Sequence, residues 1–238
     1  MAELSAKTRE ALTKVATSTL TGILNRRGFK NMFMQEVWPI RQGQPRLVGL
    51  AYTMRFIPAR EDKTRNPAAG PIQQQAMEGC PPGHVLVVDS RGDARAASAG
   101  DIYCGRLAAR GCAGIVTDGG LRDSDGVAKT GLVAYLRRPT SPPSGIVHQP
   151  VDLGRPIACG GGVAVYPGDV IVGDADGVVV IPPDIVDAVA EEAMAATLYD
   201  EFCEEEVAKG RSLIGLFPGA NDEAKRDFEA WKEARGHF

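Results

Sequence analysis

An arginine and an aspartate stand side by side at positions 122 and 123, one residue after two glycines that follow an apolar run. The guanidinium of Arg122 can bind a carboxylate through two hydrogen bonds or polarise a keto oxygen on which negative charge develops. The carboxylate of Asp123, with Asp101 and Asp118 as candidate neighbours, is the type of ligand that Mg²⁺ or Mn²⁺ prefers. The alternatives are an exposed ion pair for Arg122 and capping of a following short helix for Asp123. The stretch predicts either a small active site or a salt-bridged turn.

A second candidate lies at residues 98–103, with the sequence SAGDIY. Gly100 stands directly before a predicted helix, so the first amides of that helix, from Asp101, Ile102 and Tyr103, would point toward a bound anion. A small carboxylate or phosphate would suit this position, and the helix dipole would add to the attraction. The alternative is a capping box formed by Ser98 and Asp101. The loop predicts either a backbone anion site or an ordinary start of a helix.

The composition limits the classes of function. The chain has 238 residues, a formal net charge of -3 and a pI near 5.7, which gives no electrostatic footprint for nucleic acid. No apolar run approaches the roughly 20 residues of a membrane span. The charged N-terminus lacks the apolar region of a secretory signal. We therefore expect a cytoplasmic protein with no nucleic-acid and no membrane partner.

The metal chemistry is limited by the small number of nitrogen and sulfur ligands. The chain has five cysteines and three histidines, without a C-x-x-C pattern and without a histidine pair at a ligand spacing. This pattern argues against both a disulfide framework and a zinc site. A metal ion in this protein would be a hard cation that carboxylates and water hold.

The elements that must position these residues follow from the apolar pattern. Strands and helices alternate through the centre of the chain, which is typical of βαβ units and a parallel sheet. Ligands bind at the carboxyl ends of such strands, so Gly100–Asp101 and Asp118–Asp123 would meet at one edge. The predicted helices cover residues 5–28, 72–78, 101–111, 123–131 (a short helix or turn), 183–210 and the last part of the chain, where Asn221 or Asp222 would be the cap. The predicted strands cover residues 47–57, 84–90, 113–120 and 132–138, with a meander of short strands over 160–182 and a polar loop over 59–71.

The spacing Asp101-x20-Arg122-Asp123-x2-Gly126 resembles the signature of the family of regulator of ribonuclease activity A and 4-hydroxy-4-methyl-2-oxoglutarate aldolase. Flanking sequences such as PPGHVLVVDS and PGDVIVGDADGVVVIP agree, and the match extends from about residue 15 to 210. The resemblance implies an α/β protein with a swivelling β/β/α domain and a C-terminal helical extension. Residues 1–210 would form a single catalytic domain and residues 211–238 a helical tail. The resemblance also implies a homotrimer or a hexamer.

The resemblance further implies how a substrate binds. In the aldolases the site lies between subunits, and the substrate is a small 2-oxo acid. By the motif match, backbone amides in Gly100, Asp101, Ile102 and Tyr103 would hold the pyruvyl carboxylate. Arg122 would polarise the keto group and stabilise the enolate that forms when a carbon–carbon bond breaks.

The resemblance also implies which residues would bind a metal. Asp123 would ligate Mg²⁺, Mn²⁺ or another divalent metal directly, and Asp101 would act through a water molecule of the shell and take part in catalysis. Glu201 or Glu205 of a neighbouring subunit would complete the shell, again through water.

The implied function is a divalent-metal-dependent lyase. It would cleave a 4-hydroxy-2-oxo acid to pyruvate by aldol cleavage, and it would also decarboxylate oxaloacetate because both reactions pass through the same enolate. One alternative is a hydratase or dehydratase of a sugar-acid-derived 2-oxo acid. Another alternative is a non-catalytic regulator that binds a ribonuclease. Residues 137–149 depart from the pattern of typical aldolases in the family, which bears on the identity of the substrate.

Overall fold

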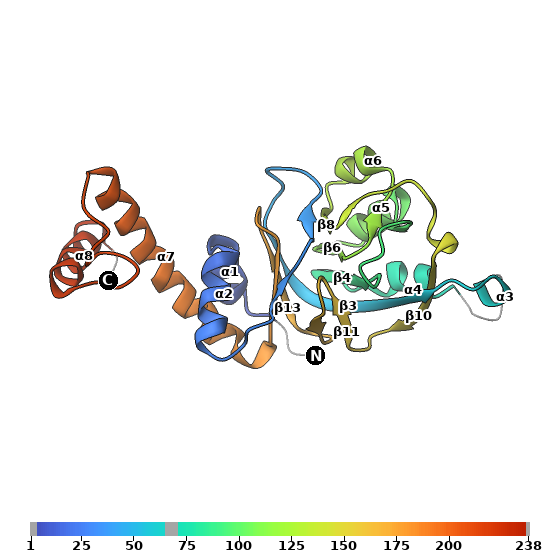
Figure 1. The fold of residues 1–238 in the computed structure, drawn as a ribbon, viewed down its shortest axis with the longest axis horizontal. Coiled ribbons are helices and arrows are strands. Elements are labelled where there is room, and N and C mark those ends of the chain that lie inside the picture. Colours follow the sequence, from blue (N-terminus) through green and yellow to red (C-terminus); the bar gives the residue numbers. More distant parts are fainter. Residues whose placement is uncertain (1–3, 65–70, 237–238) are drawn as a thin grey trace.

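The computed structural model describes residues 4–64 and 71–236 and shows a curled sheet with helices on its faces and a helical extension at the C-terminal end (Figure 1). The helices are α1 (Ala6–Lys14), α2 (Thr17–Arg26), α3 (Glu61–Thr64), α4 (Ile72–Gly79), α5 (Asp101–Ala109), α6 (Ser124–Lys129), α7 (Val186–Ala208) and α8 (Asp222–Ala234), with short 3-10 turns η2 (Ser144–Ile146) and η3 (Pro183–Ile185). The strands are β1 (Phe33–Met34), β2 (Trp38–Pro39), β3 (Leu47–Pro58), β4 (His84–Asp89), β5 (Ala97–Ala99), β6 (Gly114–Thr117), β7 (Gly120–Leu121), β8 (Val133–Leu136), β9 (Arg138–Pro139), β10 (His148–Leu153), β11 (Ile157–Cys159), β12 (Val163–Val165), β13 (Val170–Gly173) and β14 (Val178–Ile181).

The main sheet has nine strands in the order β1-β14-β13-β3-β4-β6-β8-β2, and β10 also pairs with β3. Strands β3, β4, β6 and β8 are parallel to one another, whereas β13 pairs with β3, and β14 with β13, in the antiparallel sense. The Val- and Ile-rich runs of β6, β8, β13 and β14 are buried throughout, as expected of strands with packed residues on both faces. The predicted parallel centre is confirmed. Residues 160–182 contain the predicted short strands, of which β13 and β14 pair with each other, whereas β12 pairs with β11 in a separate two-stranded sheet.

A second, smaller sheet positions the candidate site. Strands β5, β7 and β9 are parallel to one another, with Ala99 opposite Leu121. The amide of Arg122 donates to the carbonyl of Ala99 at 3.1 Å. Each of the first two strands therefore ends at a candidate segment, β5 at Gly100 and β7 at Arg122.

Three apolar clusters hold the α/β body together. One lies between the parallel strands and α4, α5 and α6, and a second packs α1, α2 and the first half of α7 against β3, β13 and β14. The third fills the inner side of the curl beneath β11 and β12. In Figure 1 the helices α1 and α2 lie on one side of the sheet, and α4, α5 and α6 lie on the other. The rigid packing of α5 and α6 fixes both segments that carry the candidate site.

The C-terminal extension has a small core of its own. The second half of α7 projects from the body and packs against α8 (Figure 1). This core contains Phe202, Cys203, Leu216, Ala224 and Trp231. The side chain of Asn221 accepts a hydrogen bond from the amide of Ala224 at 2.8 Å, which confirms one of the two predicted caps.

Two local predictions differ from the structure. The single helix expected over residues 5–28 is interrupted at Val15, whose backbone is extended, and α2 then begins at Thr17. The carboxylate of Asp174 accepts hydrogen bonds from the amide and the hydroxyl of Thr17, both at 2.8 Å, so a distant turn caps α2 and stabilises the break. The loop expected over 59–71 includes the short helix α3, and residues 65–70 of that loop lie outside the described residues. Within the described parts of the chain, no helix has the length and apolar character needed to cross a membrane.

Candidate active site

A pocket of about 350 Å³ lies where β5 and β7 end. Both candidate segments, which are separated by about twenty residues in the sequence, contribute to its wall. The lining residues are Gln73, Ala97, Ala99, Gly100, Asp101, Ile102, Tyr103, Arg122, Asp123, Pro143 and Ser144. The structure thus brings the predicted residues of both segments into one pocket, whereas Asp118 and the two glutamates lie outside it.

The N-terminus of α5 is open toward this pocket. Gly100 is the residue before the first turn and has no side chain to cap the helix, and the carboxylate of Asp101 accepts a hydrogen bond from one of the first amides, that of Ile102, at 2.8 Å. The hydroxyl of Ser98 instead lies in a buried network with the hydroxyls of Ser90 and Thr117, at 2.7 and 2.8 Å, so the capping-box alternative is wrong. The first amides of a helix have no partner within the helix, and they carry the positive end of its dipole. This end of α5 can therefore bind a carboxylate.

Gly100 is required because the chain passes close to it. A Cβ atom at this position would lie 3.0 Å from both Cγ of Arg122 and Oδ2 of Asp123. A methyl group would displace the two side chains that the pocket shares with α5. The close approach keeps the Arg122–Asp123 pair directly beside the open helix N-terminus.

The carboxylate of Asp123 faces Arg122 rather than the helix that follows it. Asp123 occupies the position before α6 with a left-handed backbone, φ 55° and ψ 45°, and its side chain does not cap that helix. Its Oδ2 lies 2.9 Å from Nε of Arg122, and both side chains are 43% exposed. A left-handed non-glycine residue carries a backbone cost of about 1 kcal/mol or more, and such residues concentrate at functional sites. The geometry thus excludes side-chain capping and retains an ion pair at the pocket.

The motif ends at Gly126, where the structure leaves no room for a side chain. A Cβ atom there would lie 2.7 Å from Oδ2 of Asp101, so only glycine lets α6 approach α5 this closely. Asp101 also accepts a hydrogen bond from the amide of Ile102 at 2.8 Å, which orients its carboxylate. Ile102 itself is 83% exposed beside the pocket. The spacing of the motif therefore follows from the contacts that hold two carboxylates and one guanidinium around one pocket.

Asp118 does not belong to this pocket. Its buried carboxylate accepts hydrogen bonds from the amides of Ser90 at 2.7 Å and Gly92 at 2.9 Å. Burial raises the pKa of Asp118 above its usual value, although the backbone donors oppose this shift. The expectation that Asp118 joins the site is wrong, because the chain crosses from the main sheet to β7 between Asp118 and Arg122.

The two candidate glutamates lie on the second half of α7, at the opposite end of the molecule from α5 and α6 (Figure 1). Glu205 accepts a hydrogen bond from Nε1 of Trp231 at 3.0 Å and pairs with Arg235 at 2.7 Å, whereas Glu201 is exposed. These contacts with α8 lower the pKa of Glu205. Either glutamate could reach a pocket of this kind only from a neighbouring subunit, as the sequence prediction requires.

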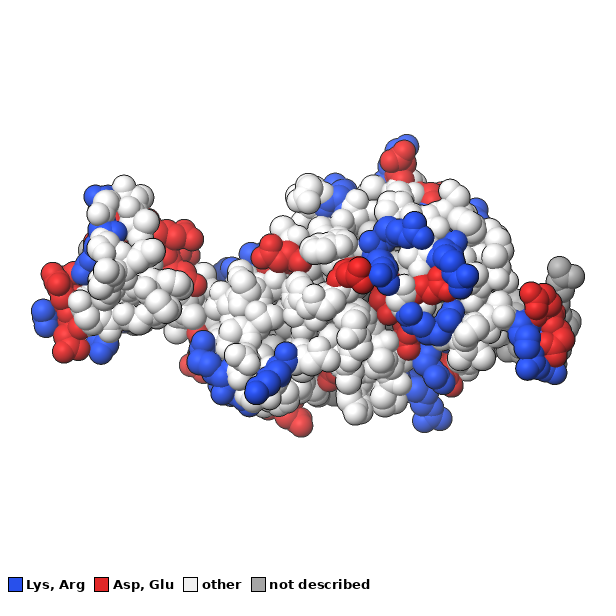
Figure 2. All heavy atoms as spheres, in the orientation of Figure 1, with Lys and Arg blue, Asp and Glu red and all other residues white. Residues whose placement is uncertain are grey.

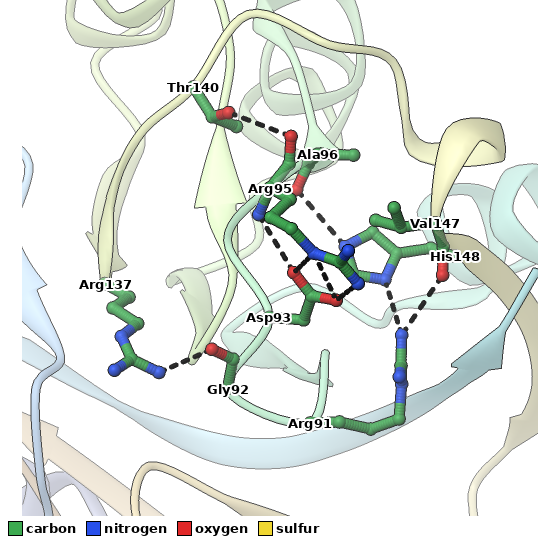
Figure 3. A network of polar contacts seen from close by, with 9 residues as sticks. All are labelled: Arg91, Gly92, Asp93, Arg95, Ala96, Arg137, Thr140, Val147 and His148. Atoms are coloured by element: carbon green, nitrogen blue, oxygen red, sulfur yellow. Dashed lines mark hydrogen bonds and ion pairs between the residues drawn. The ribbon is translucent and has the colours of Figure 1, made fainter.

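A separate polar network surrounds His148, at the other end of β5 (Figure 3). Its Nε2 lies 3.2 Å from the carbonyl of Ala96, its Nδ1 lies 3.2 Å from Nη2 of Arg91, and its ring stacks on Phe56. Burial lowers the pKa of His148 below its usual value, which favours the neutral form of the ring. The imidazole has a packing role here and does not line the pocket.

Figure 2 shows basic side chains gathered on the α/β half of the visible face with acidic ones among them.

Sequence reasoning missed Gln73 and Ser144. The amide nitrogen Nε2 of Gln73 donates to the carbonyl of Ser98 at 2.7 Å, and the hydroxyl of Ser144 donates to Oε1 of Gln73 at 3.4 Å. Both residues line the pocket, one from α4 and the other from η2. Neither position belongs to a motif, so only the folded arrangement of the chain reveals them.

The donor set of the pocket suits a hard divalent cation. Asp101 and Asp123 supply carboxylate oxygens, and Mg²⁺ is commonly bound by one or two carboxylates while it keeps several waters. Among residues 4–64 and 71–236 the structure contains no group of three or more His, Cys, Asp or Glu side chains placed to hold a metal. The residues present therefore fit a metal whose shell water, substrate or another subunit completes.

Comparisons with known proteins show the family to which the chain belongs. The sequence profile of RraA-like proteins, described as Aldolase/RraA, matches residues 17–180. The chain belongs to the RraA-like family. The match includes every residue of the pocket and ends before α7, so Glu201 and Glu205 lie outside it.

Relatives of this RraA-like protein include one from Halalkalibacterium halodurans that is 39% identical over 146 residues, covering 60% of this chain and 67% of that one. Another, from Burkholderia mallei, is 35% identical over 144 residues and covers 58% and 76% of the two chains. Both carry the provisional name 4-hydroxy-4-methyl-2-oxoglutarate aldolase.

Solved structures show the same fold. RraAS2 from Streptomyces coelicolor, described as an unusual member of the RNase ES inhibitor RraA family, is 28% identical with a TM-score of 0.76 over 86% of this chain and 98% of that one. An uncharacterized protein from Pseudomonas syringae has a TM-score of 0.77 at 22% identity, over 91% and 99% of the two chains. The predicted α/β fold of the RraA-like family, with its C-terminal helical region, is confirmed.

Proposed function

We propose that this RraA-like protein is a divalent-metal-dependent lyase that cleaves the C3–C4 bond of a 4-hydroxy-2-oxo acid and releases pyruvate. The observation that carries the proposal is the convergence, in one pocket, of the open N-terminus of α5, the guanidinium of Arg122 and the carboxylates of Asp101 and Asp123. The similarity to two proteins provisionally named aldolases supports the same type of reaction.

Each group has its own part in the proposed reaction. The first amides of α5 bind the carboxylate of the 2-oxo acid. The guanidinium of Arg122 donates to the C2 oxygen and stabilises the negative charge that develops there. As the C3–C4 bond breaks, its electron pair enters the enolate of pyruvate, C4 becomes a carbonyl carbon, and the substrate hydroxyl loses its proton. Asp101 holds the water that accepts this proton, and protonation of the enolate at C3 gives pyruvate.

A divalent ion held by Asp123, with Asp101 acting through water, would supply Lewis-acid stabilisation to the same enolate. Decarboxylation of oxaloacetate reaches that enolate by loss of CO₂ from C3. We therefore propose oxaloacetate decarboxylation as a second activity of the site.

The assembly belongs to the proposal as well. We propose a homotrimer or hexamer in which Glu201 or Glu205 of one subunit approaches the pocket of the next. Sedimentation analysis of the full chain measures the oligomeric state directly. A monomer that retains full activity would contradict the shared metal shell.

The test is pyruvate release, coupled to lactate dehydrogenase, from 4-hydroxy-4-methyl-2-oxoglutarate, other 4-hydroxy-2-oxo acids and oxaloacetate. We expect release that EDTA abolishes and Mg²⁺ or Mn²⁺ restores. Analysis of the products by NMR separates this reaction from hydration or dehydration, in which the C3–C4 bond stays intact. Conversion of the substrate with an intact C3–C4 bond would replace the lyase with a hydratase or dehydratase.

The structural likeness to RraAS2 favours a second candidate function, a regulator that binds a ribonuclease. Such a regulator needs neither Arg122 nor a metal. Binding of this protein to RNase ES, measured by calorimetry in EDTA, would support the regulator if no 2-oxo acid releases pyruvate.

A further inference from the structure

We infer that the part of the pocket formed by Gln73 and Ser144 recognises a neutral, hydroxylated end of the substrate, so that the substrate carries one carboxylate rather than two. The inference rests on the proposed function and names the substrate class of the same site. It follows from the hydrogen-bonding capacity, the charge and the size of the pocket.

The hydrogen bonds of Gln73 suit hydroxyl groups. Its Nε2 donates to the carbonyl of Ser98 at 2.7 Å, and its Oε1 accepts from the hydroxyl of Ser144 at 3.4 Å, which fixes the orientation of the amide. An amide group has two N–H donors and an oxygen with two lone pairs, so these two contacts use only one donor and one acceptor of Gln73, a residue that lines the pocket. A hydroxyl group donates and accepts, whereas a carboxylate only accepts. The pair therefore matches a hydroxylated chain better than a second carboxylate.

The charge of the pocket also favours a substrate with one carboxylate. Among the described lining residues the charged groups are Asp101, Asp123 and Arg122, which together carry one negative charge. Arg122 lies 2.9 Å from Asp123, and the proposed reaction uses it at the C2 oxygen. A divalent ion would raise the sum to one positive charge, and the glutamate of the neighbouring subunit in the proposed assembly would bring it to zero, so the pocket holds no surplus cation for a second carboxylate. A second carboxylate would be partly desolvated beside Gln73 and Ser144, and neither of these side chains is a cation.

The size of the pocket allows a substrate that is larger than pyruvate. Its volume is about 350 Å³, and it extends from the N-terminus of α5 to Gln73 and Ser144. The surfaces of Ala97 and Pro143 line the pocket and can pack against the carbon atoms of such a substrate.

The first test compares two 4-hydroxy-2-oxo acids of equal chain length. One ends in hydroxylated carbons, as in an acid derived from a sugar, and the other ends in a carboxylate. We expect kcat/KM to be roughly tenfold or more higher for the hydroxylated acid, because a site built for hydroxyl groups rejects a charge that it leaves without a partner. An equal or higher kcat/KM for the dicarboxylic acid would overturn the inference.

The second test changes the charge of this part of the pocket. Ser144→Lys should shift the ratio of kcat/KM values toward the dicarboxylic acid by roughly tenfold or more, and Gln73→Arg is a second variant with the same expected shift. Gln74→Arg is the matched control, because Gln74 lies next to Gln73 on α4 but is exposed and does not line the pocket. We expect the control to keep the ratio of the wild type. A ratio that stays constant in both pocket variants would also overturn the inference.

Exchange of the methyl protons of pyruvate with deuterium separates this inference from the proposed function. Exchange requires the enolate but has no distal group to recognise. If the wild type catalyses exchange and prefers the dicarboxylic acid, only the inference about Gln73 and Ser144 fails. If it catalyses no exchange, the proposed function fails, and this inference fails with it.

Discussion

Replacement of Arg122 by alanine separates an active-site role from a surface ion pair. The Nε atom of Arg122 lies 2.9 Å from Oδ2 of Asp123, and each side chain is 43% exposed. An exposed pair of this kind contributes about 1 kcal/mol or less to the free energy of unfolding, so Arg122→Ala should fold normally. Loss of one donor to a developing oxyanion costs about 2.7–4 kcal/mol of transition-state stabilisation, which predicts a fall in kcat of roughly 10²–10³-fold.

The assay is steady-state pyruvate release together with thermal unfolding of the same samples. Arg106→Ala is the matched control, because Arg106 lies on α5 near the pocket but forms its exposed pair with Glu78, at 2.7 Å, outside the pocket. The control should keep the kcat of the wild type. If kcat of Arg122→Ala is unchanged, or falls only as much as in the control, Arg122 is only part of a surface ion pair and the reasoning is refuted.

Three further predictions concern metal binding, the glycine of the motif and the loss of stability at acidic pH. Asp123→Ala should abolish metal-dependent turnover and weaken Mn²⁺ binding in calorimetry, while its circular dichroism spectrum stays that of the wild type. Full turnover in this variant would show that Asp123 is not the metal ligand. Gly126→Ala should lower kcat by roughly tenfold or more, because its Cβ would lie 2.7 Å from Oδ2 of Asp101 and displace that carboxylate; an unchanged kcat would show that Asp101 needs no exact position. The Arg95 guanidinium lowers the pKa of Asp93 from 3.8 to about 2, so the pair stabilises the fold above pH 3.8, and this contribution is lost as the pH falls toward 2. Because Arg95 is largely exposed, solvent screening makes this contribution small, and urea unfolding at several pH values should show Asp93→Asn without this loss.

The centre of the fold could be predicted because its signals are local. The buried runs of β4, β6 and β8 contain mainly Val, Ile and Leu, and glycines end the intervening helices. The motif that begins at Asp101 and ends at Gly126 also follows from the sequence, and the structure shows why its spacing matters. Two close approaches, at Gly100 and at Gly126, bring α5, Arg122 and Asp123 around one pocket.

The second sheet could not be predicted in the same way. Strands β5, β7 and β9 have two or three residues each, which is too short to show an alternation of apolar and polar side chains. They form because the backbone groups of segments far apart in the sequence pair with one another. This sheet, rather than the main one, delivers Gly100 and Arg122 to the pocket.

The other differences also depend on contacts between distant residues. The break at Val15 is stabilised by Asp174, which lies far along the chain and caps α2 from a turn. Gln73 and Ser144 meet only after α4 and η2 have packed beside β5. Sequence patterns report the local preferences of a segment, and such contacts are not part of them.

The most direct test of the central claim is exchange of the methyl protons of pyruvate in D₂O, followed by NMR. The account predicts exchange by the wild type with Mg²⁺, loss of exchange in EDTA, and a rate at least roughly a hundredfold lower in Arg122→Ala. Such a result would establish that this pocket forms and stabilises the enolate of pyruvate. Absence of exchange with every divalent metal, or exchange that persists in Arg122→Ala, would contradict the account.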